Sequence, residues 1–160
     1  MKIIYIHHGN RELGNPPSKD DDLTEIGYED ARLNNKLFKN VSVKAVYTSP
    51  YFRCRRTAEI IFAGKNIPIY EDERLNEYGK WNKNVEGETW TQLQERIMAS
   101  VKDIVFRYND EDIVAVVTSG VNVVGFLNLA YKLKPSETAP FVMIPSCSPM
   151  TFDIDKSCFE

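Results

Sequence analysis

Residues 2–9, Lys-Ile-Ile-Tyr-Ile-His-His-Gly, hold the pattern that decides the fold. A continuous run of apolar side chains rich in isoleucine is typical of a strand buried on both faces, as in parallel sheets. The run stops at His7 and His8, which are the only two histidines in the chain. We therefore expect a buried strand whose carboxyl end carries polar groups.

Similar apolar runs recur along the chain and alternate with helical patterns. Further strands are expected at residues 44–48, 67–70, 112–118, 141–144 and 150–154. Helices are expected after the capping residues Thr24, Ser49 (with Pro50 in the first helical position and an end near Gly64) and Thr89, and from Ser119-Gly120 to about Tyr131. This alternation predicts an α/β fold, a three-layer α/β/α sandwich around a mainly parallel sheet whose last two strands form an antiparallel edge.

Length and composition indicate one ordinary domain, residues 1–160, large enough to bury a full core. The net charge of −3 and the pI near 5.5 give no basic field for nucleic acid or an anionic membrane. The three cysteines, Cys54, Cys147 and Cys158, form no C-x-x-C pair, so we expect reduced, structural thiols. The opening apolar run is too short for a signal peptide or a membrane span, and a cytoplasmic protein is expected.

Polar residues follow three of the expected strands, at residues 6–9, 47–50 and 117–120. Ligands of parallel sheets bind beyond the carboxyl ends of the strands, and two of these ends lead into helix N-termini, which favour anions. Arg53 lies in the first turn of the second helix, where its guanidinium can grip phosphate oxygens at two points. Arg55 and Arg56 are expected on the solvated helix surface.

Three other chemistries find little support. Ser119 lies at a strand-to-helix junction but lacks the G-x-S-x-G pattern of a nucleophilic serine, and no histidine follows it. Two adjacent histidines without further converging ligands do not make a metal site, so none is expected. The chain has no P-loop and no G-x-G-x-x-G, and no cofactor is expected.

Taken together, these segments resemble the histidine phosphatase superfamily, whose members are built like the cofactor-dependent phosphoglycerate mutases. The resemblance runs in order over nearly the whole chain. Residues 6–9 look like the family's Arg-His-Gly motif, residues 23–27 like its Leu-Thr-x-x-Gly, residues 49–58 like its Ser-x-x-x-Arg-x-x-x-Thr-Ala, residues 75–79 like the stretch with its acidic residue, and residues 87–89 like its Gly-Glu-Ser. Ser119-Gly120 falls where the family has its second His-Gly.

The resemblance implies a role for each matching residue. His8 would be the nucleophile that becomes a phosphohistidine, Arg53 would hold the transferring oxygens, and Glu77 would protonate the leaving alcohol and then assist water. The implied substrate is a small phosphorylated metabolite or a phosphoprotein, and inorganic phosphate is the product. Neutral imidazole is a nucleophile near pH 7, which agrees with the first of these roles.

The chain departs from the family pattern at two positions around the phosphate. His7 replaces the expected arginine and Ser119 the second histidine, so both lose a fixed positive charge at neutral pH. We hypothesise that Arg11, on the loop after the first strand, supplies a guanidinium in compensation. His7, Arg11, Arg53 and Ser119 are thus the expected phosphate-binding residues.

Two functions remain open from the sequence, beside a third reading as a structural α/β module whose interactions lie elsewhere. The first is a metal-independent phosphatase of reduced activity, favoured over a mutase because the chain leaves little room for the helical insertions of mutases. The second is a catalytically silent relative that binds a phosphate-containing or acidic ligand. Specificity is expected in the loops at residues 9–22, 76–88 and 145–149, and the oligomeric state is not predicted.

Overall fold

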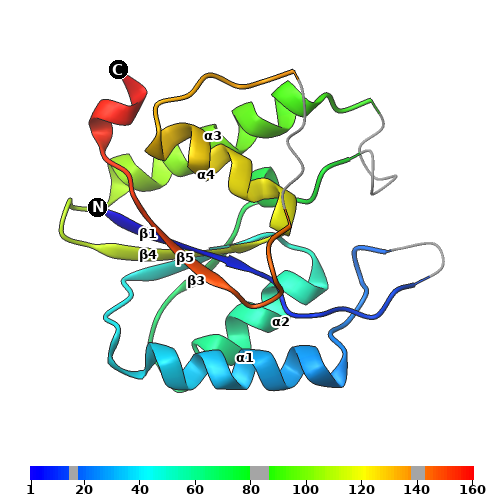
Figure 1. Ribbon diagram of the computed structural model, residues 1–160. Coiled ribbons are helices and arrows are strands. Elements are labelled where there is room, and N and C mark those ends of the chain that lie inside the picture. Colours follow the sequence, from blue (N-terminus) through cyan, green and yellow to red (C-terminus); the bar gives the residue numbers. More distant parts are fainter. Residues whose placement is uncertain (15–17, 80–86, 138–142) are drawn as a thin grey trace.

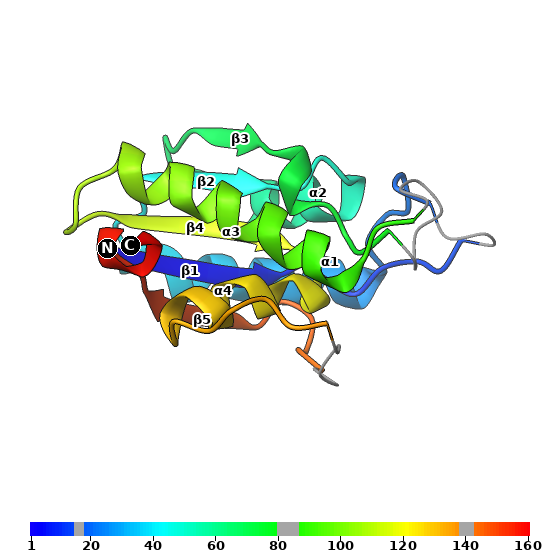
Figure 2. The same ribbon diagram turned by 90° about the horizontal axis from the view of Figure 1, so that it is seen from above.

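The structure, a computed structural model, describes residues 1–14, 18–79, 87–137 and 143–160. Within these residues one five-stranded sheet has the order β3-β2-β4-β1-β5. Its strands are β1 (Lys2–His7), β2 (Ala45–Thr48), β3 (Ile69–Glu71), β4 (Ile113–Thr118) and β5 (Pro149–Asp153). Strands β1 to β4 are parallel to their neighbours, and β5 pairs with β1 in the antiparallel sense. Figure 2 shows the parallel strands running in one direction between the helices.

Helices cover both faces of this sheet (Figure 1). The helices α1 (Glu25–Leu37) and α2 (Phe52–Ile61) pack on one face, while α3 (Trp90–Arg107) and α4 (Val123–Ala130) pack on the other. Strands β1 and β4 lie at the centre and are almost fully buried, because helices cover them on both sides. The expected three-layer α/β/α sandwich with a mainly parallel sheet is confirmed.

The helix caps at Thr24 and Thr89 are as predicted. The Thr24 hydroxyl accepts a hydrogen bond from the Gly27 amide, and Thr89 forms a capping box with Gln92. The predicted cap at Ser49 with Pro50 is wrong, since α2 begins at Phe52 after an extended Tyr51. The Ser49 hydroxyl accepts a hydrogen bond from the Tyr51 amide, which precedes the helix, and donates one to the Asn76 side chain. It therefore connects the end of β2 to a distant loop and caps no residue of α2.

The predicted edge of two antiparallel strands is only partly correct. Strand β5 forms this edge, but Met143 and Ile144 are not in a strand, while Phe141 and Val142 lie outside the described residues. The Ile144 carbonyl contacts the His7 ring and not a neighbouring strand. The residues just before β5 therefore contact the end of β1 and do not extend the sheet.

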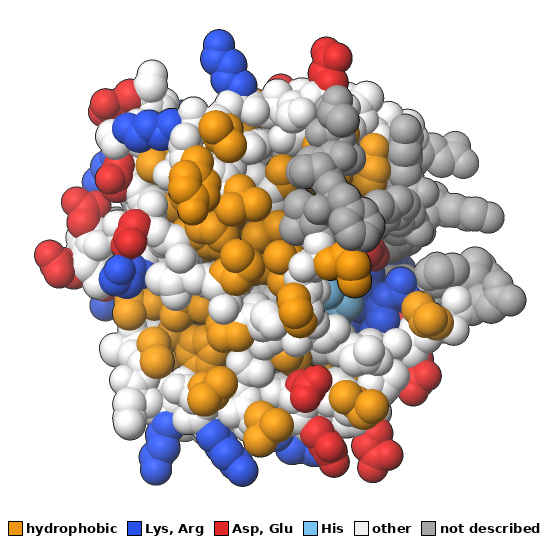
Figure 3. Space-filling model, in the orientation of Figure 1, with side chains coloured by type: hydrophobic (Ala, Val, Ile, Leu, Met, Phe, Trp, Pro, Cys, Tyr) orange, Lys and Arg blue, Asp and Glu red, His pale blue; other side chains and the backbone are white. Residues whose placement is uncertain are grey.

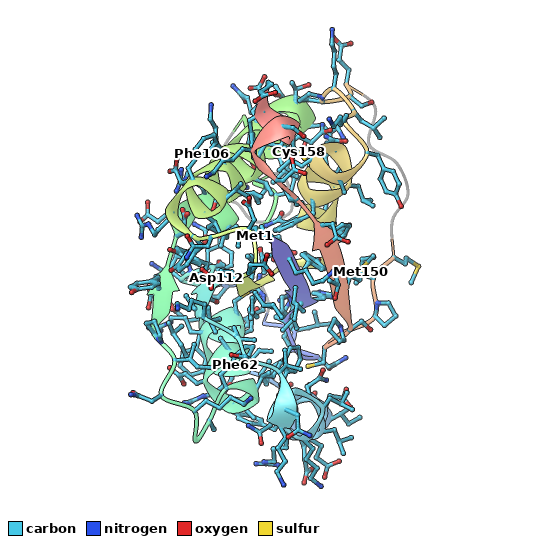
Figure 4. The ribbon with its side chains drawn as sticks, turned by 90° about the vertical axis from the view of Figure 1, so that its left-hand side faces the viewer. Met1, Phe62, Phe106, Asp112, Met150 and Cys158 are labelled. Atoms are coloured by element: carbon cyan, nitrogen blue, oxygen red, sulfur yellow. The ribbon has the colours of Figure 1, made fainter. Side chains whose placement is uncertain are left out.

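Figure 4 views the molecule from the end where the parallel strands begin. Met1 and Asp112 lie at the sheet in this view, with Phe62 in the α1/α2 layer below and Phe106 and Cys158 above. The carboxyl ends of the strands, with the expected site residues, are at the opposite end. No helix in the described ranges is long and apolar enough to cross a membrane.

Candidate active site

The site is assembled by the register of β1 and β4. His7 pairs with Thr118 at the end of the two strands, and the His8 amide donates to the Thr118 carbonyl over 2.9 Å. His8 and Ser119 therefore leave the sheet side by side although they are far apart in the chain. The neighbouring β2 ends at the same level, because the Ser49 amide donates to the Val117 carbonyl.

His8 is held in one orientation by both of its ring nitrogens. Its Nδ1 lies 2.8 Å from the Gly9 carbonyl oxygen, and its Nε2 lies 3.2 Å from Nε of Arg53. Because the guanidinium can only donate, Nε2 must be the acceptor and Nδ1 must carry the proton. The lone pair of Nε2 therefore points towards Arg53 and accepts the hydrogen bond from its Nε–H.

The surroundings of His8 keep its imidazole neutral. The ring is buried with 5% exposure, and burial lowers its pKa well below 6.5. The charges of His7 and Arg53 lower this pKa further, whereas the bond to the Gly9 carbonyl raises it. The side chain is therefore unprotonated at neutral pH.

Arg53 is a fully buried cation, with 1% exposure, and it has a partner on each side of its guanidinium. Besides its hydrogen bond to His8, the guanidinium donates one from Nη1 to the Ser18 carbonyl over 3.2 Å and one from Nη2 to the Glu77 carboxylate over 2.5 Å. The face of the group packs on the Tyr51 ring, with 4.9 Å from the guanidinium carbon to the ring centre. The Glu77 carboxylate supplies the counter-charge that a buried arginine requires.

The spacing of residues in α2 explains this placement. Arg53 and Thr57 are four residues apart and lie on the same helix face. The Thr57 hydroxyl donates to the Arg53 carbonyl over 2.7 Å and accepts from the Gly9 amide over 2.9 Å. Thr57 thus fastens the first turn of α2 to the loop that follows His8.

His7 leaves β1 on the α3/α4 side. Its Nδ1 lies 2.8 Å from the Ile144 carbonyl, and its ring meets that of His8 edge-on with 4.5 Å between centres. A Cβ at Gly120 would lie 3.1 Å from the His7 ring, so a side chain there would require the ring to shift by a few tenths of an ångström. Burial lowers the pKa of His7, although the carbonyl contacts and Glu77 oppose this shift. His7 is therefore mainly neutral at neutral pH.

Ser119 is almost fully buried, with 1% exposure. Its carbonyl accepts from the Tyr5 hydroxyl over 2.8 Å, but its own Oγ has no partner among the residues that the structure describes. A buried hydroxyl without a partner is costly in a folded protein. It is an available hydrogen-bond donor at the end of β4.

Arg11 contacts an acidic residue and not His8. Its Nη1 lies 2.7 Å from a carboxylate oxygen of Asp21, and the same oxygen accepts from the Ser18 amide. Arg11 is thus tied to the loop that also gives Arg53 a carbonyl partner. Any role of Arg11 in binding phosphate would require this ion pair to be exchanged.

The expected specificity loops are only partly described. Residues 15–17 and 80–86 fall outside the described ranges, and so does half of the expected strand before residue 145. A cavity of about 570 Å³ lies between the first two loops and the start of α2, lined by Lys19, Tyr51 and Asn76 among others. It adjoins Arg53 through Tyr51 but does not include His8 in its lining.

Figure 3 shows that the site reaches the surface, with pale blue histidine atoms beside blue Lys and Arg side chains on the right of that face.

The surroundings limit cysteine and metal chemistry in this part of the chain. Burial raises the pKa of the Cys54 and Cys147 thiols to about 12, so neither is a thiolate nucleophile at neutral pH. Over the described ranges, no three His, Cys, Asp or Glu side chains gather in a way that could hold a metal ion.

Several residues that complete the site were not singled out from the sequence. They are Thr118, Asn122 and Arg96, which bind backbone groups of the segment that carries Glu77. Thr57 fell within the motif at residues 49–58 but was given no role, and it binds the Gly9 amide. A buried polar residue that serves the backbone of a distant segment leaves no local pattern in the sequence.

Comparison with known proteins identifies relatives of this chain. The family profile described as "Histidine phosphatase superfamily (branch 1)" matches residues 3–86 and 80–160. The Probable phosphatase C1620.13 of Schizosaccharomyces pombe is 40% identical over 58 residues, which are 36% of this chain and 21% of that protein. A 2,3-bisphosphoglycerate-dependent phosphoglycerate mutase of Thermoplasma acidophilum is 28% identical over 130 residues, 63% of this chain and 65% of that protein. In these matches the chain spans less than two thirds of either curated relative.

Solved structures match over nearly the full length. Bacillus stearothermophilus YhfR superposes with a TM-score of 0.80 and 26% identity, covering 97% of this chain and 92% of that chain. A phosphoglycerate mutase from Bacillus anthracis str. Sterne superposes with a TM-score of 0.77 and 16% identity, covering 94% and 86%. The second likeness is one of fold alone.

Proposed function

The chain belongs to the histidine phosphatase superfamily (branch 1), and on this premise we propose that it is a metal-independent phosphoric monoester hydrolase acting through a phosphohistidine on His8. The observation that carries the proposal is the contact of His8 Nε2 with Arg53 Nε at 3.2 Å, with Glu77 on the same guanidinium. A nucleophile, an anion-binding cation and a carboxyl group therefore meet at one point.

The first step transfers the phosphoryl group to the protein. The substrate phosphate takes the place of His8 as acceptor of the Arg53 N–H, which frees the Nε2 lone pair. This lone pair attacks phosphorus, a P–N bond forms, and the P–O bond to the alcohol breaks. Arg53 binds the equatorial oxygens, on which the negative charge is spread in the transition state. This role requires the substrate phosphate to replace Glu77 as the partner of the Arg53 guanidinium, so that Glu77 can take up a proton. Protonated Glu77 then gives its proton to the leaving oxygen, so that an alcohol departs and not an alkoxide.

The second step restores the free histidine. Water attacks the phosphohistidine while the Glu77 carboxylate accepts its proton, the P–N bond breaks, and inorganic phosphate leaves. Nδ1 of His8 keeps its proton throughout, because the Gly9 carbonyl holds it. The substrate class is a small phosphorylated metabolite or a phosphoprotein.

The positive charge around the phosphate is low for this chemistry. His7 is mainly neutral at neutral pH, and Ser119 offers one neutral donor. Loss of one preorganised donor slows catalysis by about 10² to 10³-fold, so we expect slow turnover that improves as His7 gains a proton in acid. The same deficit favours a second candidate function, a phosphate-binding protein without catalysis.

Hydrolysis of an activated aryl phosphate between pH 5 and 8 separates the two functions. A phosphatase gives a rate that rises towards acid pH in the parent chain and vanishes in His8→Ala. Arg56→Ala is the matched control and keeps the parent rate, because Arg56 is on the same helix as Arg53 but pairs with Glu59 on the surface and does not line the cavity beside the site. A binding protein gives negligible rates in both chains, together with thermal stabilisation by inorganic phosphate that Arg53→Ala removes.

A further inference from the structure

The backbone that carries Glu77 is held by side chains from other parts of the fold. The four consecutive carbonyl groups of residues 74–77 each accept a hydrogen bond from Arg96 on α3, from Asn122 at the start of α4, or from Thr118 at the end of β4. The segment begins inside the short 3-10 helix Glu73–Leu75 and lies outside the sheet, so side chains and not strand backbone provide these bonds. These three side chains therefore help to fix its conformation.

Arg96 makes most of these contacts. Its Nη1 donates to the carbonyls of Arg74 (2.6 Å) and Asn76 (2.7 Å), and its Nη2 donates to that of Glu77 itself over 3.1 Å. The guanidinium thus bridges three carbonyls within one short segment. An ammonium group could not reproduce this planar fork.

Glu88 fixes Arg96 from the other side. The two side chains form a two-point ion pair, Nε to Oε1 at 2.5 Å and Nη2 to Oε2 at 3.1 Å. One carboxylate oxygen of Glu88 also accepts from the Gly79 amide over 2.9 Å. Burial acts to raise the pKa of Glu88, but the bonds from Arg96 and Gly79 outweigh it and hold this pKa below its usual value. Arg96 and Glu88 therefore form a permanently charged clamp on both sides of residue 77.

We propose that Arg96, backed by Glu88, is a positioning residue that places the Glu77 carboxyl group for proton transfer to the leaving group. This inference rests on the proposed function, because it gives Glu77 the role of general acid. Misplacement of a reacting group by about 1 Å can cost about 10²-fold in rate. Loss of the clamp therefore impairs the proton transfer and leaves the nucleophile and the phosphate site in place.

The dependence of the rate on the leaving group separates positioning from simple structural support. A nitrophenolate leaves readily without a proton, whereas an alkoxide needs one. In Arg96→Met we expect kcat/KM for an alkyl phosphate to fall about 10- to 100-fold and that for nitrophenyl phosphate to change less than about 3-fold. This ratio reports the steps up to the departure of the leaving group, so hydrolysis of the phosphohistidine does not affect it.

Three further variants make the comparison specific. Glu77→Gln is expected to show the same selective loss, and the double variant Arg96→Met/Glu77→Gln is expected to be no worse than Glu77→Gln alone, because Arg96 acts through Glu77. Arg96→Lys keeps the charge next to Glu88 but is expected to retain most of the defect. Arg74→Met is the matched control, since that side chain bonds Asp72 and Asp103 and no carbonyl of residues 74–77.

A second measurement does not depend on catalysis. The Nε–H proton of Arg53 is buried and hydrogen-bonded, so its NMR resonance reports whether Glu77 still contacts the same guanidinium. Arg96→Met should shift this resonance in the same direction as Glu77→Gln. An unshifted resonance, or an equal loss of rate with both esters, overturns the proposal for Arg96. If the parent chain hydrolyses neither ester but Arg96→Met still shifts the Arg53 resonance, the positioning of Glu77 by Arg96 is supported. Only the proposed function is then disproved.

Discussion

Acidification from pH 7 to 5.5 should destabilise the folded chain through its two histidines. The pKa of His8 is well below 6.5 in the folded state, and that of His7 is lowered as well, in both cases chiefly because burial disfavours the charged form. An unfolded chain binds protons at these residues near pH 6.5. The unfolded state therefore takes up more protons than the folded state as the pH falls, and stability is lost below about pH 6.5.

The size of the effect follows from the burial of His8. For one histidine that stays neutral in the folded state, the free energy of unfolding falls by about 1.3 kcal/mol between pH 7 and 5.5. His7 adds a smaller amount, because carbonyl contacts and Glu77 oppose its shift. We expect a total loss between about 1.3 and 2.5 kcal/mol.

Carboxyl groups do not obscure this pH window. The pKa values of Asp72 and Glu88 are lowered in the folded state by bonds to Arg74 and Arg96 that outweigh burial. Their contribution to stability is present above the unfolded values of 3.8 and 4.5 and is lost only as the pH falls below these values.

Urea unfolding at pH 7, 6.5, 6 and 5.5 measures the effect, with His8→Gln as the comparison. The variant should lose about 1.3 kcal/mol less than the parent over this range, whatever its stability at pH 7. A free energy of unfolding that is constant with pH, or that falls equally in the two chains, would refute the assignment of His8 as a buried neutral imidazole.

The remaining predictions concern the phosphate site. Ser119→His should raise the rate of aryl phosphate hydrolysis by about 10-fold or more, because it adds a donor at the end of β4; an unchanged rate would mean that the deficit lies elsewhere. Arg53→Ala should abolish phosphate-dependent thermal stabilisation, and Arg11→Ala should weaken it; unchanged stabilisation in Arg11→Ala disproves compensation by that residue. Gly120→Ala should cost about 1 to 3 kcal/mol in urea unfolding, because its Cβ would lie 3.1 Å from the His7 ring, and a variant of parental stability would contradict this packing.

Most of the fold could be predicted from local patterns. The apolar runs that became β1 and β4 are buried by helices on both faces, and the caps at Thr24 and Thr89 use hydroxyls in a purely local geometry. The start of α2 could not be predicted in this way. Ser49 has the residue type and the following proline of a cap, but its hydroxyl donates to Asn76, which is 27 residues away in the chain.

The site was predictable where residues lie at the ends of adjacent strands. His8 and Arg53 follow the ends of β1 and β2, Glu77 was named from the family resemblance, and the structure places both His8 and Glu77 in contact with Arg53. The residues that support Glu77 could not be predicted, because Arg96 and Asn122 bind the backbone of a segment that is far from them in the sequence. The partner of Arg11 also required coordinates, since a loop arginine next to several aspartates can pair with any of them.

The most direct test of the account is to trap the proposed intermediate. The chain is mixed with an excess of aryl phosphate, quenched within one turnover in alkali, under which phosphohistidine survives, and digested for mass spectrometry. We expect one phosphoryl group on the peptide that contains His8, lost on acid treatment and missing in His8→Ala. Hydrolysis without this adduct, or an adduct that forms equally in His8→Ala, would contradict nucleophilic attack by His8.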